Sequence, residues 1–316
     1  MIETGRCIIN GTDISTLGMF IERNGSNDFL SFPDRCTPDY NDWAEHDGLD
    51  VDLTDLSFDA KKVTVNYVLI AQDETLFKQC LNSFETLHKT SDYLNIYVAE
   101  FNKTFQLRFT GFSKYEQNSG FTTPGKKTAK ISVDYMMDDP LQVYTTAVGV
   151  PISSRAMSAH VSINSYDLSR FGIVVRNVYS SAMIPRSGKA VLERKFDNLS
   201  GLIADTEEPK TKPRQVEIQC TMLANTLAEL MTNMSALWAN MNTISPVRLH
   251  VFDEGMQCYY TKMSRFEKDA SFRRKITVSF NLHLQEFSEI ELVRLLAAQD
   301  NRLISTESEI LIDLNY

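Results

Sequence analysis

The sequence of 316 residues has few of the features that mark a secreted disulfide-bonded protein or a membrane protein. Its five cysteines are odd in number, and no two stand in a C-x-x-C pair. We interpret them as reduced thiols that act mostly as small apolar side chains, in a protein made in a cytoplasm. No run approaches the roughly 18 to 20 apolar residues of a membrane span. The start, Met1–Arg6, has no basic region before an apolar run, so we expect no signal peptide.

Catalytic and cofactor-binding motifs are also absent. The sequence contains no G-x-x-x-x-G-K-[ST] phosphate loop, no G-x-G-x-x-G and no G-x-S-x-G. Residues 120–127 read GFTTPGKK, which is only faintly like a phosphate loop, and we interpret them as a mobile hairpin loop. We therefore expect no enzyme activity, no cofactor, and no catalytic, cofactor-binding or metal-binding residue.

Histidines and one acidic run are the remaining candidates for a metal site. None of the five histidines stands in H-E-x-x-H or pairs with a cysteine at zinc spacing. His250 and His283 fall in predicted strands, where we interpret them as packing or edge residues. Four closely spaced carboxylates resemble calcium ligands but lack the order of an EF-hand loop. We favour a solvated strand entry for this run, which comprises Asp47, Asp50, Asp52 and Asp55.

Basic residues do not dominate the charge. There are 41 acidic and 32 basic residues, for a formal net charge of −9. A general nucleic-acid binder would show a basic face, so we expect no specific nucleic-acid binding. Hydrophobic residues make up 43% of the chain, which is ordinary for a globular protein, and the length suggests two domains.

The informative feature is an internal repeat. Residues 9–21 read INGTDISTLGMFI and residues 163–175 read INSYDLSRFGIVV, 154 positions later. Further matches follow in the same order, with small changes of offset where loops are expected. Chance does not supply six ordered matches, so we interpret the chain as two tandem copies of one domain. The identical positions of the first match are Ile9, Asn10, Asp13, Ser15 and Gly18, which recur as Ile163, Asn164, Asp167, Ser169 and Gly172.

Periodicity predicts the same order of elements in both copies. Alternation of apolar residues predicts strands over 63–69 and 216–222. Helical spacing then predicts one helix per copy, capped by Asp73 in the first and by Asn225 or Thr226 in the second. An offset of 154 aligns these helices and matches Phe84 with Trp238. A hairpin and a closing strand complete the copies, over 94–98, 105–109 and 128–135, and over 247–252, 257–260 and 275–282.

We therefore expect a mainly β fold with one helix per repeat, an α+β arrangement of two tandem β-sandwich or split-barrel domains. The stretches 22–50 and 176–212 have little periodicity, which is typical of functional or mobile connections. A helix over 288–299 and a strand over 309–314 follow the second copy, and the strand could pair with a sheet edge. The predicted parts are a first domain at 1–145, a linker at 146–160, a second domain at 161–287 and a C-terminal extension at 288–316.

Trp43 and Trp238 are the only tryptophans. Trp238 falls at a core position of the second predicted helix. Trp43 lies in a predicted loop, and it is the better candidate for contact with a partner.

The opening INGTDISTLG of residues 9–18 resembles the start of distal tail proteins of long-tailed phages. Those proteins often begin with a short strand, an Asn-Gly turn and a polar stretch that ends in an apolar residue and glycine. The strand at 62–70, the helix at 73–88 and the hairpin with RFTG at 108–111 look like the rest of that domain. So does the closing ISVDY at 131–135 with DDP at 138–140. The resemblance covers about residues 7–145 and, more weakly, 161–287.

The resemblance implies a structural protein of a phage or prophage-derived tail tip or baseplate. In that family the domain forms a ring around the DNA channel, between the tail tube and the host-recognition parts. Self-association into a hexamer, or into a trimer with pseudo-sixfold symmetry, is implied, because three chains with two copies supply six domains. The implied partners are the tail tube and the tail-tip or hub proteins. The implied location is the virion tail, after synthesis in the bacterial host cytoplasm.

One departure from the family and two alternatives remain. The commonest family members carry a sugar-binding-like domain after the ring domain, whereas a second ring-like domain follows here, which puts carbohydrate binding in doubt. The alternative is a tandem β-domain binding module that recognises a glycan or protein on a cell surface. The other alternative is an enzyme. It ranks last, because no nucleophile, acid–base pair or metal cluster stands out in the sequence.

Overall fold

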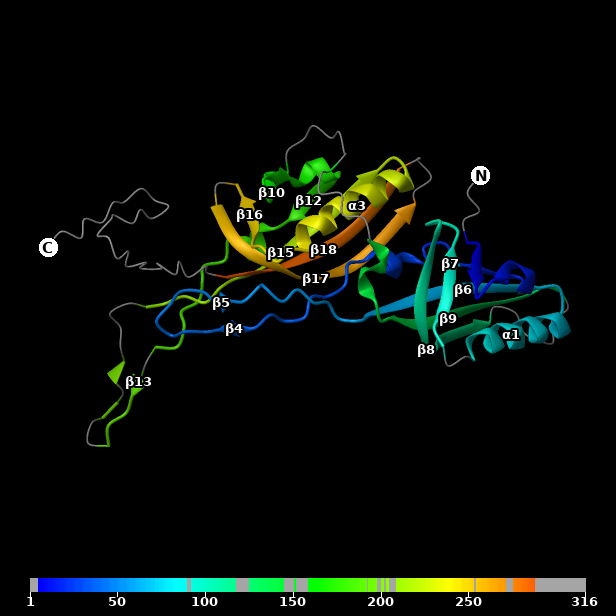
Figure 1. Cartoon of the computed structure of the whole chain (residues 1–316), viewed down its shortest axis with the longest axis horizontal. Helices are drawn as coiled ribbons and strands as arrows, with labels where there is room; N and C mark the ends of the chain where they lie inside the picture. Colours follow the sequence, from blue (N-terminus) through cyan, green and yellow to red (C-terminus); the bar gives the residue numbers. More distant parts are fainter. Residues whose placement is uncertain are drawn as a thin grey trace, which may run out of the picture.

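The computed structural model contains two antiparallel seven-stranded sheets with the same strand order (Figure 1). We call residues 5–144 the first repeat and residues 159–287 the second repeat. The mainly β fold with one long helix per repeat is confirmed. The structure describes residues 5–89, 92–117, 125–144, 151, 159–191, 193–197, 200–201, 203–204, 209–252, 254–270 and 275–287. The predicted C-terminal helix and strand lie outside these residues, as do most of the predicted linker and of the loop at 120–127.

The sheet of the first repeat has the order β2-β1-β7-β8-β9-β6-β3. Helix α1 (Glu74–His88) packs against β6 and covers one face of the sheet. Side chains of β6 and β9 alternate between buried and partly exposed along their whole lengths, as a half-buried strand requires. The strands are β1 (Cys7–Ile9), β2 (Thr12–Asp13), β3 (Met19–Ile21), β6 (Lys61–Ala71), β7 (Leu94–Val98), β8 (Lys103–Gln117) and β9 (Lys127–Met137).

The sheet of the second repeat has the equivalent order β11-β10-β16-β17-β18-β15-β12. Helix α3 (Leu227–Met241) packs against β15, and a short helix, α2 (Tyr179–Ala182), also contacts this strand. The strands are β10 (Val161–Ile163), β11 (Tyr166–Asp167), β12 (Ile173–Asn177), β15 (Gln215–Ala224), β16 (Val247–Val251), β17 (Glu254–Ala270) and β18 (Ile276–Glu286).

The repeated opening motif is a capping device. Asp13 accepts a hydrogen bond from the Ser15 N–H and so caps the short 3-10 helix η1 (Ile14–Leu17). Gly18 ends η1 in the left-handed region, where a Cβ would collide with the carbonyl oxygen of Ile70. The motif is therefore conserved between the copies for backbone reasons. The same arrangement surrounds η4 (Leu168–Phe171), with Asp167, Ser169 and Gly172.

The predicted register of the helices is wrong by one residue. Asp73 caps α1 and Thr226 caps α3, so the helices are offset by 153 positions and not by 154. Trp238 is therefore equivalent to Glu85. Trp238 is nevertheless fully buried, whereas Glu85 is only partly buried, with 45% of its side chain exposed. The burial of Trp238 comes from a segment of the first repeat, described below.

Two strands are longer than the sequence predicted. Strand β8 continues past Phe109 to Gln117, and β17 spans Glu254–Ala270. Both contain β-bulges, between Phe109 and Gly111 in β8 and between Tyr260 and Lys262 in β17, with a second bulge further along each strand. A bulge breaks the two-residue alternation on which the prediction depended.

The two long stretches without periodicity form hairpin arms. The first arm, residues 31–60, contains β4 (Tyr40–Asn41) paired with β5 (Asp50–Val51). The second arm, residues 184–213, contains β13 (Glu193–Arg194) paired with β14 (Ile203–Ala204). All four strands and their register match at an offset of 153. The first arm runs along the second repeat, whereas the second arm extends away from both sheets (Figure 1).

Two further 3-10 helices lie next to the first arm. They are η2 (Asn27–Leu30), which contacts β6 and β17, and η3 (Pro140–Val143). Buried side chains of both repeats form one continuous apolar cluster, in which Phe32 of the first arm contacts Trp238 of α3. The cores of the repeats thus meet at the first arm.

Candidate functional site

Within the described residues, no group of three or more His, Cys, Asp or Glu side chains is arranged to hold a metal ion. The neutral core residue His88 bonds to Tyr135 (Nε2 to Oη, 2.6 Å), and burial lowers its pKa. His283 bonds to Ser264, and His160 stacks on Phe252. Each of these three histidines thus contacts a different partner.

The cysteines lie separately as well. All five are free, and Cys36 is the one that is not buried. Burial raises the pKa of the Cys7 thiol to about 12, although a hydrogen bond with Tyr67 opposes the shift. A thiol of that pKa is not a nucleophile at neutral pH. Neither long helix of the described residues has the length and apolar character needed to cross a membrane.

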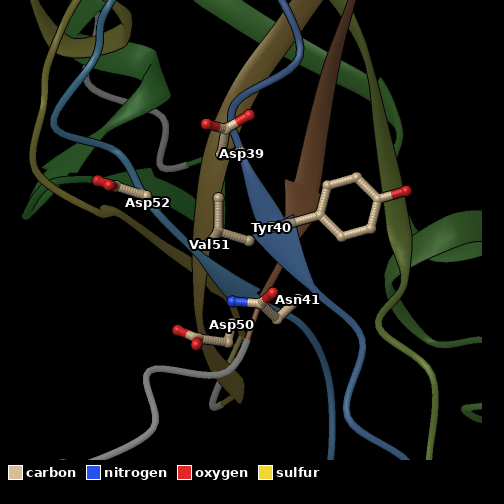
Figure 2. Close-up of a pocket in the computed structure, with 6 residues that line it drawn as sticks. All are labelled: Asp39, Tyr40, Asn41, Asp50, Val51 and Asp52. Carbon is tan, nitrogen blue, oxygen red and sulfur yellow. The ribbon is translucent and has the colours of Figure 1, made fainter.

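Part of the acidic run lines a polar surface pocket of about 690 Å³ on the first arm. Figure 2 shows Asp39, Asp50 and Asp52 at separate corners of this pocket, without convergence on one point. Asp52 accepts hydrogen bonds from the backbone and the hydroxyl of Thr54, which lower the pKa of its carboxyl. The carboxylates of the run are otherwise turned to solvent or, at Asp47, bonded to the second arm.

The most extensive arrangement that the structure builds is the contact of the first arm with the second repeat. It begins with a backbone hydrogen bond: the Arg35 N–H donates to the carbonyl oxygen of Thr261 at 2.8 Å. Thr261 occupies the bulge of β17, and its hydroxyl donates to the carbonyl of His283. The bulge directs the Thr261 carbonyl toward the arm. The arm edge is thus paired with the second sheet at this point.

Aromatic side chains anchor the arm beside this bond. The indole of Trp238 contacts Phe32 and Phe58, with ring centroids 4.9 and 5.0 Å apart. Tyr260 packs edge-on to the indole, and its hydroxyl donates to the carbonyl of Pro33 at 3.0 Å. Trp238 and Tyr260 are fully buried, so the arm excludes water from this part of the contact.

Arg35 and Leu53 extend the contact to Tyr259, which precedes Tyr260 in β17. The guanidinium of Arg35 lies over the ring of Tyr259, and burial lowers the Arg35 pKa, opposed by the charge interaction with Tyr259. Its Nη1 donates to the carbonyl of Thr243. Leu53 packs against Tyr259 and Phe287 in a small apolar cluster of its own. A pocket of about 320 Å³ beside this contact is lined by Asp34, Arg35, Lys262 and His283, among others.

The far end of the first arm contacts the base of the second arm. The Gly48 N–H donates to the carbonyl of Thr211, and the Asp47 carboxylate accepts from the Thr211 N–H and hydroxyl. These bonds lower the pKa of the Asp47 carboxyl. Lys189 donates to the carbonyl of Trp43 and pairs with Asp42. Trp43 therefore contacts the second arm through its backbone, while its side chain is half exposed.

The body of the first repeat adds one buried ion pair. Lys268 of β17 is buried and pairs with Glu100 at 2.6 Å, and it also lies over the ring of Phe101. Ser26 donates to the other oxygen of Glu100. Because the Lys268 amine and the Glu100 carboxylate each have a further partner, the pair fixes the position of β17 against the first repeat.

A basic side chain holds the base of each arm, buried in the first repeat and mostly buried in the second. In the first repeat the Lys61 amine donates to the carbonyls of Phe29 and Ser31. Burial lowers its pKa to about 7, opposed by the charges of Asp28 and Asp34. The equivalent residue of the second repeat, 153 positions later, is Arg214.

Arg214 makes the same kind of contact, through Ala182, which is equivalent to Phe29. Its Nη1 donates to the carbonyl of Ala182, and its Nε donates to Glu286 at 3.1 Å. Burial alone would raise the pKa of Glu286, but hydrogen bonds from Arg186 and Arg214 outweigh it and lower this pKa to about 2. The base of the second arm is therefore fixed by an ion cluster that has no counterpart among the described residues at the base of the first.

Sequence reasoning missed most of this contact. It singled out Trp238 but assigned it to the core of its own repeat, and it did not single out Arg35, Phe32 or Thr261. One signal was available: aligned on the helix caps, Trp238 stands at the position of Glu85, and charged residues mostly lie at the surface. Burial of Trp238 at such a position requires a second partner. The partner follows from long-range packing, which a local period does not reveal.

No protein-family model and no curated protein sequence matches the chain. Among solved structures, it aligns with the Dit protein of phage SPP1, which is described as a paradigm of the hub adsorption apparatus in phages that infect Gram-positive bacteria. The alignment covers 90% of this chain and 100% of that chain, with 9% sequence identity and a TM-score of 0.32. A likeness of this size is weak and does not establish a shared family.

Proposed function

We propose that the chain is a non-enzymatic structural component of a phage or prophage-derived tail tip or baseplate. In this role it forms a ring around the DNA channel, between the tail tube and the host-recognition parts. Its proposed partners are further copies of itself, the tail tube and the tail-tip or hub proteins, and its proposed location is the virion tail.

One observation carries the proposal: the first arm docks on an equivalent unit that has an arm of its own. Such a contact is head-to-tail, because arm and receiving sheet are different surfaces. A head-to-tail contact that is repeated closes a ring when its rotation fits, and it otherwise extends as a filament. Each chain supplies two units. A ring of six units therefore requires three chains, and a ring of twelve units requires six chains.

The charge of the chain is consistent with a channel wall. A net charge of −9 disfavours tight binding of phosphates, so DNA would pass such a ring without being held. The proposal requires no sequence-specific contact with nucleic acid.

A second candidate is a tandem binding module for a glycan or a protein on a cell surface. Exposed aromatic side chains on the first arm favour it: Tyr40 is 54% exposed and Trp43 is 48% exposed. Aromatic rings presented in this way are common at carbohydrate and protein contacts. Binding of the purified chain to a glycan array or to cell-wall material, abolished by Trp43→Ala, would favour this candidate.

Multi-angle light scattering of the purified full chain, with negative-stain images, tests the ring. The subunit mass is 36.0 kDa. We expect a discrete assembly of three or six chains with a central hole. A monomer that persists at the highest attainable concentration would count against the ring and leave the binding module as the better candidate.

A further inference from the structure

The second arm has the geometry of the first but not its contacts. Residues 30–35 of the first repeat are mostly buried against the second repeat, whereas the equivalent residues 183–188 are all exposed. The exposed set includes Met183 and Ile184, each 53% exposed. This segment has the backbone shape of its buried counterpart, and the described part of the chain does not cover it. A surface that matches it is therefore sought on another molecule.

The backbone of the second arm presents the same donor as the first. In the first arm, the Cys36 N–H donates to Ser57 and the Asp59 N–H donates to Asp34, so the N–H of Arg35 between them turns outward to Thr261. In the second arm, Lys189 donates to Lys210 and Lys212 donates to Ser187. Gly188 is paired with Thr211 as Arg35 is with Phe58. By this antiparallel register, the Gly188 N–H turns outward in the same way.

The first repeat carries the matching receiving surface. Strand β8 has a bulge at Thr110, between Phe109 and Gly111, at the position of the Thr261 bulge in β17. The Thr110 hydroxyl donates to the carbonyl of Asp134 at 2.8 Å, as the Thr261 hydroxyl does to His283 at 3.0 Å. The two bulges therefore have the same hydrogen-bonding pattern.

The described residues of the chain leave this surface uncovered. Residues 112–116 of β8 are all exposed. Phe112 is 44% exposed, whereas its counterpart Met263, which pairs with β18 as Phe112 pairs with β9, is 7% exposed. The second arm extends at the opposite end of the molecule from β8 (Figure 1), so it does not reach this surface in its own chain.

We propose that the second arm docks on the first repeat of a second copy of this chain, with the Gly188 N–H donating to the Thr110 carbonyl of that copy. This inference rests on the proposed ring and identifies its inter-chain contact. We call the contact of the first arm with the second repeat the internal joint, and the proposed contact the inter-chain joint. In an assembly of chains linked in this way, internal joints and inter-chain joints alternate around the ring.

The side chains of the inter-chain joint are mostly polar. At the position of Trp238 stands Glu85, and at that of Phe32 stands Pro185. Tyr259 and Phe287 are replaced by Arg108 and Asp138, which form an exposed ion pair with each other. The inter-chain joint therefore depends more on backbone pairing, and it is weaker than the internal joint. The difference lets each chain fold around its internal joint before chains associate.

Two glycine variants of the full chain test the backbone bond. Gly188→Pro removes the N–H donor, whereas Gly188→Ala keeps it and adds a Cβ whose nearest neighbour is the carbonyl oxygen of Lys210 at 3.9 Å. We expect Gly188→Pro to raise the dissociation constant of the assembly about ten- to hundredfold in sedimentation velocity, because a carbonyl loses its donor at the contact. Gly188→Ala should change it less than about threefold.

Cross-linking tests the pairing directly, even if the proline disturbs the arm. In a Cys36→Ser background, Gly188→Cys and Thr110→Cys on one chain should yield covalent multimers with a short bismaleimide. Chains that carry one cysteine each should yield only dimers when mixed. Gly188→Cys with Leu76→Cys is the control, because Leu76 is 40% exposed but lies at the start of α1.

The outcomes separate this inference from the proposed function. An assembly that is insensitive to Gly188→Pro and gives no Gly188–Thr110 cross-link contradicts the inter-chain joint and leaves the ring in place. A wild-type chain that remains monomeric, together with a chain carrying Gly188→Cys and Thr110→Cys that gives no cross-link, contradicts both. Cross-linking at this pair together with weakened assembly in Gly188→Pro supports both.

Discussion

The two arms have the same backbone and opposite surroundings. Both are hairpins with the same pairs of strand residues at an offset of 153, and both are held at the base by a basic side chain that donates to backbone carbonyls. The first arm lies on the second sheet with Phe32 and Phe58 around Trp238, while the second arm presents Pro185 and Thr211 at those positions. The comparison shows that backbone register determines the hairpin, whereas a few side chains determine the surface on which the hairpin docks.

Removing Trp238, the aromatic anchor of the first arm, should have the largest effect on the difference between the two arms. We expect Trp238→Ala to lower the free energy of unfolding by about 3 to 5 kcal/mol, because it leaves a cavity between α3, Phe32 and Phe58. Urea denaturation measures the loss. The other tryptophan is the control: Trp43→Ala should change stability by no more than about 0.5 kcal/mol. A loss below about 1 kcal/mol for Trp238→Ala would mean that the arm is held by its backbone bond alone.

Acid should loosen the base of the second arm. The folded pKa of Glu286, about 2, lies below its ordinary value of 4.5, so its stabilisation is present above about pH 4.5 and is lost as the pH falls toward 2. The contribution at neutral pH is about 2 to 3 kcal/mol. We expect Glu286→Gln to remove that part of the acid dependence in unfolding curves taken from pH 6 to 2.

The exposed carboxylate of Glu85 provides the matched control for this experiment. Glu85→Gln should retain the acid-dependent loss, because the Glu85 carboxylate pairs with Lys89 at the surface. If Glu286→Gln and the wild type lose stability in parallel below pH 4.5, the ion cluster does not hold the arm.

Grafting the anchor of the internal joint onto the second arm would sharpen the comparison. Glu85→Trp combined with Pro185→Phe restores the pair formed by Trp238 and Phe32, now between chains. We expect association about tenfold tighter or more in sedimentation velocity, as buried aromatic residues dominate contact energies. Glu85→Gln, which removes the charge without adding a ring, should fall well short of this gain. No change in association would place Glu85 outside the inter-chain joint.

The smallest expected effect is at the far end of the first arm. Asp47→Ala removes the acceptor of two Thr211 hydrogen bonds, and we expect a loss of about 1 kcal/mol in local stability. Amide hydrogen exchange at Thr211 should accelerate accordingly. Asp47→Asn retains an acceptor oxygen and should preserve most of the protection. Equal exchange in all three proteins would show that this end of the arm is already open in solution.

Much of the fold could be predicted from the sequence, because it follows from local patterns of apolar residues and helix caps. Alternation over 63–69 and 216–222 predicted β6 and β15. The cap of the first helix was predicted at Asp73, and that of the second at Asn225 or Thr226, of which the structure shows Thr226. The mainly β class followed from those patterns and is confirmed. The predicted domain boundaries remain a prediction.

What the sequence did not predict depends on contacts between distant residues. Strands β8 and β17 were predicted too short because bulges interrupt their alternation. The arms were not predicted because their strands are two residues long and the first arm is held by partners about 200 positions away, such as Thr261 and Trp238. A matched pair of arms is visible only when both repeats are folded.

The covalent link between the repeats has a consequence for the first arm. Its docking surface is part of the same molecule, so docking is unimolecular and takes place at an effective concentration in the millimolar range. The second arm meets its proposed surface only at the concentration of the protein itself. Each chain thus completes its internal joint however few copies surround it, and the population of rings is governed by the supply of chains.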